Sequence, residues 1–141
     1  MTAHKQDEYG LSVPPDGARL LRYRDDLPGV RAFAGTAARQ AGLSHRRADD
    51  FVLAISELAS NTLAHTESPG VLTLWTVGDE LVGQVSDVGH ITVPRPGQVR
   101  PSAGAVAGHG LWLVHQLCDH VRIRTGPNGT TIQVRMRLGS R

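Results

Sequence analysis

The chain has 141 residues, 40% of them hydrophobic, and a formal net charge of +2, as expected for one soluble domain with a single core. No apolar run is long enough to cross a bilayer, and the polar N-terminus does not resemble a signal peptide. The only cysteine, Cys118, excludes an internal disulfide and a cysteine-rich zinc site. These features predict a cytoplasmic protein that has no membrane partner.

Lysine is almost absent from the chain. Lys5 is the only one, and the other fourteen basic residues are arginines. A Walker-type loop needs a lysine on the phosphates, and an ordinary protein kinase needs one on a core strand. Both architectures are therefore excluded, and a protein of this sequence that handles a nucleotide must use another one.

The N-terminal half is predicted to hold a strand and two helices, after a loose polar tail over residues 1–17. Alternating polarity over residues 18–24 indicates the strand. The second helix runs to about residue 65. Capping residues bound both helices, namely Asp25 or Asp26, Pro28 and Gly42 for the first and Ser44 for the second.

The C-terminal half is predicted to hold four strands and one helix. Residues 71–77 and 81–87 form a hairpin. Residues 88–107 are rich in Pro and Gly, which indicates a lid or binding loop before an amphipathic helix. Two strands follow, separated by a turn at residues 126–129.

These elements predict one domain over residues 18–138. Its expected fold class is α+β, a two-layer sandwich with a mostly antiparallel sheet and helices packed on one face. The second face of the sheet is expected to be open and basic, because arginines occupy the outward parity of the strands: Arg22, Arg24, Arg122, Arg124, Arg135 and Arg137.

Three polar residues form a line along the second helix. Glu57, Asn61 and His65 are four residues apart, so they lie along the border of its apolar stripe. Half-buried polar groups need partners, and a bound metal–phosphate would supply them. A polar flank that simply faces solvent is the other interpretation of this segment.

Two further features join this line in a fixed order. Asp87 shares the parity of the apolar residues at the end of its strand, unless it merely begins the turn. Gly108 and Gly110 precede a helix, where backbone N–H groups and the helix dipole favour anions, although a helix that starts at a flexible loop would look the same. Together they allow Asp87 to accept from a purine amine, Asn61 to hold Mg²⁺ and the glycines to cradle phosphates.

The short sequence motifs around these residues, here called boxes, resemble those of the GHKL ATP-binding superfamily. This superfamily includes gyrase, heat-shock chaperones, histidine kinases and mismatch-repair ATPases. The resemblance covers roughly residues 18–138 and implies the Bergerat ATP-binding fold. The small size is most similar to the anti-sigma factor serine kinases of that superfamily. The matching segments are Glu57-x-x-x-Asn61-x-x-x-His65, Asp87-x-Gly89, Gly108-His109-Gly110-Leu111 and Gly129-Thr130-Thr131.

The resemblance implies ATP and Mg²⁺ as cofactors and a role for each matching residue. It makes Glu57 the general base, Asn61 the magnesium ligand and Asp87, with Thr130 beside it, the reader of the adenine amine. Gly89 would shape the pocket under the base, and the box from Gly108 through His109 and Gly110 to Leu111 would wrap the phosphates. His65 matches a frequent family position without a defined role.

One box departs from the family pattern. The sequence Asp87-Val88-Gly89-His90-Ile91 lacks the second glycine of Asp-x-Gly-x-Gly. This difference concerns the hinge of the lid and the affinity for nucleotide rather than the fold.

The function implied by the resemblance is that of an anti-sigma factor. Such a kinase phosphorylates a serine or threonine of an anti-anti-sigma (STAS-type) protein and sequesters a sigma factor, commonly as a homodimer. The alternative is a non-catalytic, ATP-gated binding module. Nucleic-acid binding through the arginine-bearing strands is disfavoured, because few aromatic residues are interleaved with the arginines.

Overall fold

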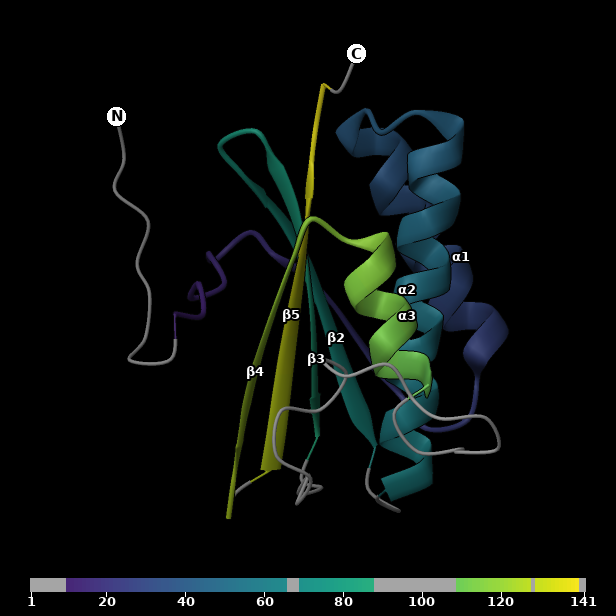
Figure 1. Cartoon of the computed structure of the whole chain (residues 1–141), viewed down its shortest axis with the longest axis vertical. Coiled ribbons are helices and arrows are strands. Elements are labelled where there is room, and N and C mark those ends of the chain that lie inside the picture. Colours follow the sequence, from purple (N-terminus) through teal and green to yellow (C-terminus); the bar gives the residue numbers. More distant parts are fainter. Residues whose placement is uncertain (1–9, 66–68, 88–108, 128, 140–141) are drawn as a thin grey trace.

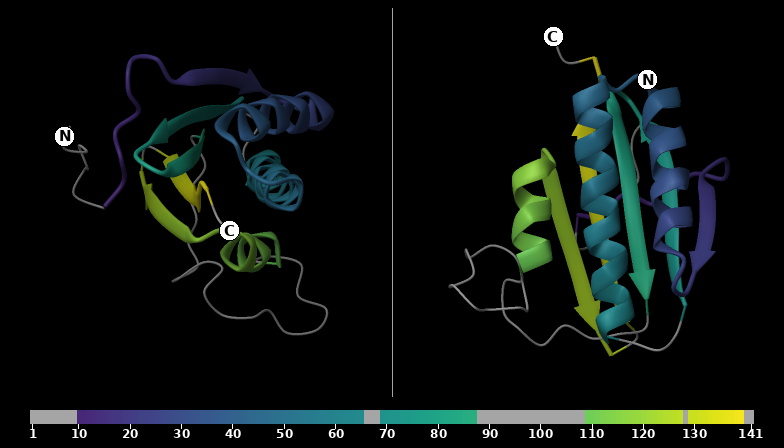
Figure 2. Two further views of the ribbon diagram at one scale, coloured as in Figure 1. Left: turned by 90° about the horizontal axis from the view of Figure 1, so that it is seen from above. Right: turned by 90° about the vertical axis from the view of Figure 1, so that its right-hand side faces the viewer.

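A single antiparallel sheet with helices on one face forms the domain (Figure 1, Figure 2). The structure is a computed structural model that describes residues 10–65, 69–87, 109–127 and 129–139. All four strand pairings are antiparallel, in the order β1-β2-β3-β5-β4. The predicted α+β two-layer class is confirmed. The elements are β1 (Arg19–Tyr23), α1 (Leu27–Ala41), α2 (His45–His65), β2 (Gly70–Val77), β3 (Glu80–Asp87), α3 (His109–Leu117), β4 (His120–Gly126) and β5 (Gly129–Arg137).

The predicted caps set the boundaries of the first two helices. The Asp26 carboxylate accepts from Gly29 N at 3.0 Å, which resolves the choice between two aspartates. Gly42 ends α1 in the left-handed conformation, with φ of 98°. Ser44 Oγ accepts from Arg47 N at 3.2 Å and so caps α2.

The core lies between the sheet and α2, the central helix of the three (Figure 2). Phe51, Ile55 and Leu58 of α2 are fully buried. Phe51 and Ile55 face β3 at Gly83, where an added Cβ would lie 2.8 Å from Ile55 Cδ1. The missing side chain therefore lets α2 approach the sheet closely, which fixes the height of the helix above the strands.

The opposite face of the sheet is partly covered by the segment before β1. Leu11 and Ser12 are 2% and 5% exposed, so the expectation of a loose tail does not hold for these two residues. The Gln133 side chain of β5 pairs with the Ser12 backbone, accepting from Ser12 N at 2.9 Å and donating to Ser12 O at 2.6 Å. The Gln133 amide thus makes the two hydrogen bonds to the Ser12 backbone that a neighbouring strand would otherwise make.

The expected open, basic face is also more closed than its arginines suggested. Arg135 donates to the Ser12 hydroxyl and to Glu80 at 3.0 Å, and its side chain is only 12% exposed. Gln133, at 1% exposed, also donates to Gln84 at 2.7 Å. This part of the face is a buried polar network rather than a solvated basic surface.

Three chain segments meet at one end of the molecule. The ends of α2 and β3 and the start of β5 lie at the lower end in Figure 1, and α3 begins above them, beside α2; Figure 2 agrees. No helix in the described part of the chain is both long and apolar enough to span a bilayer.

Candidate functional site

The start of α3 contacts the polar line of α2. A Cβ added to Gly110 would lie 2.9 Å from Glu57 Oε2 and 3.5 Å from Asn61 Nδ2. Glu57 and Asn61 are both partly exposed. Two of the three residues on the predicted line are thus brought against the N-terminal turn of α3, where backbone N–H groups lack helical partners.

Asp87 and Thr130 lie side by side at the same end of the sheet. They are partners in the register of β3 and β5. Thr130 is 3% exposed, and its Oγ1 lies 2.9 Å from Thr125 Oγ1 on β4. Asp87 is the last residue of β3, so the alternative that it merely begins the turn is wrong. Its parity with the buried Val85 places its side chain on the helix side.

Tyr23 joins this end of the sheet from β1, and the sequence motifs did not mark it. Its side chain is buried, and its Oη has no hydrogen-bond partner among the described residues. The sequence signal for the burial of Tyr23 was strand parity, because Tyr23 and Leu21 are two residues apart in β1 and therefore point to the same side of the sheet, toward the helices. A buried, unpartnered hydroxyl beside the predicted site is the kind of group that a polar ligand satisfies.

The other predicted site residues are only partly covered. Leu111 is 5% exposed and packs in the core. Gly89 and Gly108 lie outside the described residues, as does the predicted lid. For His65 and His109 the structure describes the helical backbone alone.

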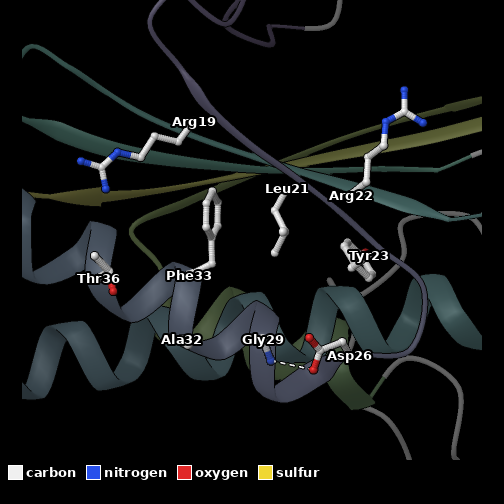
Figure 3. Close-up of a pocket in the computed structure, with 9 residues that line it drawn as sticks. All are labelled: Arg19, Leu21, Arg22, Tyr23, Asp26, Gly29, Ala32, Phe33 and Thr36. Carbon is white, nitrogen blue, oxygen red and sulfur yellow. Dashed lines mark hydrogen bonds between the residues drawn. The ribbon is translucent and has the colours of Figure 1, made fainter.

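Two of the pockets in the described part of the chain contain none of the residues Glu57, Asn61 and Asp87. One of about 480 Å³ lies between β1 and α1 (Figure 3). Leu21, Phe33 and Tyr23 point into it, whereas Arg19 and Arg22 extend away (Figure 3). The other, of about 540 Å³, lies at the opposite end of the sheet, near Gly78. None of the residues predicted to bind the nucleotide lines the pocket in Figure 3, so this pocket is not the predicted nucleotide site.

Three solved structures with a similar fold are distant in sequence. The RsbU and RsbW domains of Rv1364c from Mycobacterium tuberculosis share 23% identity, with a TM-score of 0.66, over 91% of this chain and 34% of that one. The blue-light activated histidine kinase of Erythrobacter litoralis EL346 shares 19%, with a TM-score of 0.55, over 84% and 42%. Histidine kinase AdeS of Acinetobacter baumannii shares 12%, with a TM-score of 0.56, over 86% and 68%. The chain thus spans about a third of the length of the Mycobacterium tuberculosis chain, and these likenesses show the fold.

Comparison with curated proteins finds no match. The family model described as the histidine kinase-like ATPase domain matches residues 22–136, from within β1 to within β5. Its match covers most of the chain, including every residue of the boxes described above. The chain therefore belongs to the histidine kinase-like ATPase domain family, of the GHKL type.

Proposed function

We propose that this domain is an ATP-dependent protein serine/threonine kinase of the anti-sigma type. It would phosphorylate an anti-anti-sigma protein of the STAS type and sequester a sigma factor. Family membership implies ATP as the ligand. The observation that carries the proposal further is the contact of Glu57 and Asn61 with Gly110 at the start of α3.

The residues present suit ATP and Mg²⁺. Gly110 has no Cβ, which lets Glu57 and Asn61 approach the first turn of α3, whose backbone N–H groups would bind phosphate oxygens. The Asn61 amide oxygen would be the protein ligand of Mg²⁺, which commonly takes one or two protein oxygens. Bound ATP supplies a transferable phosphoryl group.

Glu57 would act on the partner protein. Its carboxylate lies one helical turn from Asn61, the proposed metal ligand, and would accept the proton of a serine or threonine hydroxyl. Asp87 and Thr130, at the end of β3 and the start of β5, would bind the exocyclic amine of adenine. Gly89, Gly108, His109, Leu111 and His65 complete the proposed site by their positions in the boxes.

The anti-sigma assignment is supported by the box order and by the fold shared with the RsbU and RsbW domains of the Mycobacterium tuberculosis neighbour. A homodimer is part of the proposal. The second candidate is an ATP-gated module that binds a partner protein without transferring a phosphoryl group to it.

Two measurements test the proposal. Calorimetric titration with ATP and Mg²⁺ should show binding to the wild type and a loss of about tenfold or more for Asp87→Asn, because an amide cannot replace a carboxylate that accepts from the base. Transfer from labelled ATP to STAS-type proteins should disappear in Glu57→Ala, while ATP binding persists.

The outcomes separate the candidates. Transfer that survives Glu57→Ala removes the assignment of the base. Binding without transfer to any partner supports the ATP-gated module. An absence of binding by the wild type removes the whole site. Asp49→Ala, on the exposed side of α2, is the matched control.

A further inference from the structure

Tyr23 is buried at the end of β1 with its hydroxyl unsatisfied. The residue is 4% exposed, and its side chain points from β1 to the helix side of the sheet (Figure 3). Its Oη has no hydrogen-bond partner among the described residues. A buried hydroxyl without a partner destabilises the fold, whereas phenylalanine would fill the same space without that penalty.

The register explains where the hydroxyl lies. Tyr23 is paired with Gly70, and Val71 is paired with Ser86. Continuing the second register by one residue places Gly70 opposite Asp87. Tyr23, Gly70, Asp87 and Thr130 therefore form one row across four strands, on the helix side of the sheet.

Gly70 leaves the space that the tyrosine occupies. A Cβ on Gly70 would lie 2.4 Å from Tyr23 Cζ and 2.5 Å from its Oη. The tip of the ring thus covers the bare backbone of β2. Because neighbouring strands are about 4.8 Å apart, the hydroxyl lies roughly one strand spacing from β3, where Asp87 is the next residue of the row.

The local electrostatics keep this hydroxyl a donor. Burial raises the pKa of Tyr23, the nearby Thr62 hydroxyl lowers it, and the negative charge of Asp87 raises it. The Thr62 hydroxyl itself donates to Leu58 O at 3.2 Å. The phenol is therefore protonated at neutral pH and can donate to a carboxylate.

We propose that Tyr23 is a positioning residue for Asp87, whose carboxylate accepts from the Tyr23 hydroxyl, directly or through one water, when a purine is bound. A hydrogen bond of this kind stabilises the ionised carboxylate, which can only accept. Asp87 then favours a base with an exocyclic amine over a base with a carbonyl at that position. The inference rests on the proposed role of Asp87.

The test compares ADP with inosine diphosphate, in which a carbonyl replaces the amine. Calorimetry should show that Tyr23→Phe binds ADP roughly five- to tenfold more weakly than the wild type, with inosine diphosphate affinity changed less than twofold. The melting temperature should stay the same or rise, because an unsatisfied hydroxyl has been removed. A merely structural role would weaken both ligands equally and lower the melting temperature.

Matched variants separate the outcomes. Thr73→Val removes a buried hydroxyl from the other face of the sheet and should keep the wild-type ratio of affinities. Gly70→Ala should lose selectivity as Tyr23→Phe does, because its Cβ displaces the ring. If Gly70→Ala does not fold, Tyr23→Phe, which lacks a single atom, decides the question.

Failure of this inference differs from failure of the proposed function. Wild type that binds neither ligand, or Asp87→Asn that binds ADP as tightly as wild type, overturns the role of Asp87. If Asp87→Asn loses selectivity and Tyr23→Phe keeps the wild-type ratio, only the role of Tyr23 is overturned.

Discussion

Arg47 Nη2 donates to Asp119 Oδ2 at 2.7 Å and so joins the first turn of α2 to the turn between α3 and β4. The same carboxylate oxygen accepts from Arg137 N at 2.7 Å, and Arg47 also donates to Arg137 O at 3.3 Å. A single carboxylate thus links the helix layer to the end of β5.

This link predicts a pH-dependent contribution to stability. Burial opposes ionisation of Asp119, but the hydrogen bonds from Arg137 N and Arg47, with the two arginine charges, hold its pKa below the ordinary value. A lowered folded-state pKa gives stability that is fully present above the unfolded pKa of about 3.9 and is lost as the pH falls through the folded pKa.

We expect Asp119→Asn to lower the free energy of unfolding by about 1–2 kcal/mol at pH 7. The difference from wild type should shrink below about pH 4, as measured by urea unfolding at both pH values. Asp49→Asn is the control, because the His45–Asp49 pair is 94% and 70% exposed and should contribute little. A difference that is equal at pH 3 and pH 7 would contradict the prediction.

Gly83→Ala should destabilise the core. Its Cβ would lie 2.8 Å from Ile55 Cδ1 and 3.1 Å from Phe51 Cζ, both fully buried. We expect a loss of about 1–3 kcal/mol in urea unfolding. Gly126→Ala, whose Cβ meets nothing within 4 Å, should change stability by less than about 0.5 kcal/mol. Similar values for the two variants would show that α2 is free to move away from β3.

Gly110→Ala should separate function from stability. Alanine is the better helix former, so the fold is expected to persist. Its Cβ would lie 2.9 Å from Glu57 Oε2, and displacing that carboxylate should slow phosphoryl transfer by about ten- to a hundredfold. Labelled-ATP transfer and thermal melting measure the two effects. Unchanged transfer by the folded variant would argue against Glu57 as the base.

Gln133→Leu should release the segment before β1. Leucine keeps the volume but loses the paired hydrogen bonds with the Ser12 backbone. We expect faster hydrogen exchange at Ser12 N and a loss of about 1–2 kcal/mol. Val30 N, bonded to Asp26 O within the helix layer, serves as the internal reference. Protection of Ser12 at the wild-type level would show that another contact holds the segment.

Cys118 should be unreactive in the folded protein. Burial, and secondarily the charge of Asp119, raise the pKa of its thiol to about 12, so little thiolate forms at pH 8. Iodoacetamide should therefore label it in urea but leave it largely unmodified in buffer, as mass spectrometry will show. Rapid labelling in buffer would mean that the core opens there.

Local signals in the sequence were sufficient to predict the helices and strands of the described part of the chain. The caps at Asp26, Gly42 and Ser44 act within a few residues of themselves, so the helix boundaries follow from chemistry that is visible in a short window. Strand parity likewise predicted which side of β3 Asp87 faces.

Such local signals could not predict contacts between segments that are distant in the sequence. Ser12 and Gln133 are 121 residues apart, and nothing in a polar N-terminal stretch indicates a pairing with a glutamine of the last strand. The sequence placed Gly110 and Glu57 in one proposed site, but it did not predict that they are in contact. Tyr23 escaped notice because its closeness to Asp87 depends on a glycine in the strand between them.

The Gln133–Ser12 pairing bears on how the protein should be trimmed. A fragment of residues 18–138 would keep every strand and helix that the structure describes. It would lack Ser12, however, whose backbone pairs with the Gln133 amide, a side chain that is only 1% exposed in the longer chain. Water would then reach the outer sheet face at Gln133, and Arg135 would lose the Ser12 hydroxyl to which it donates. The smallest fragment with native behaviour should therefore begin before Leu11.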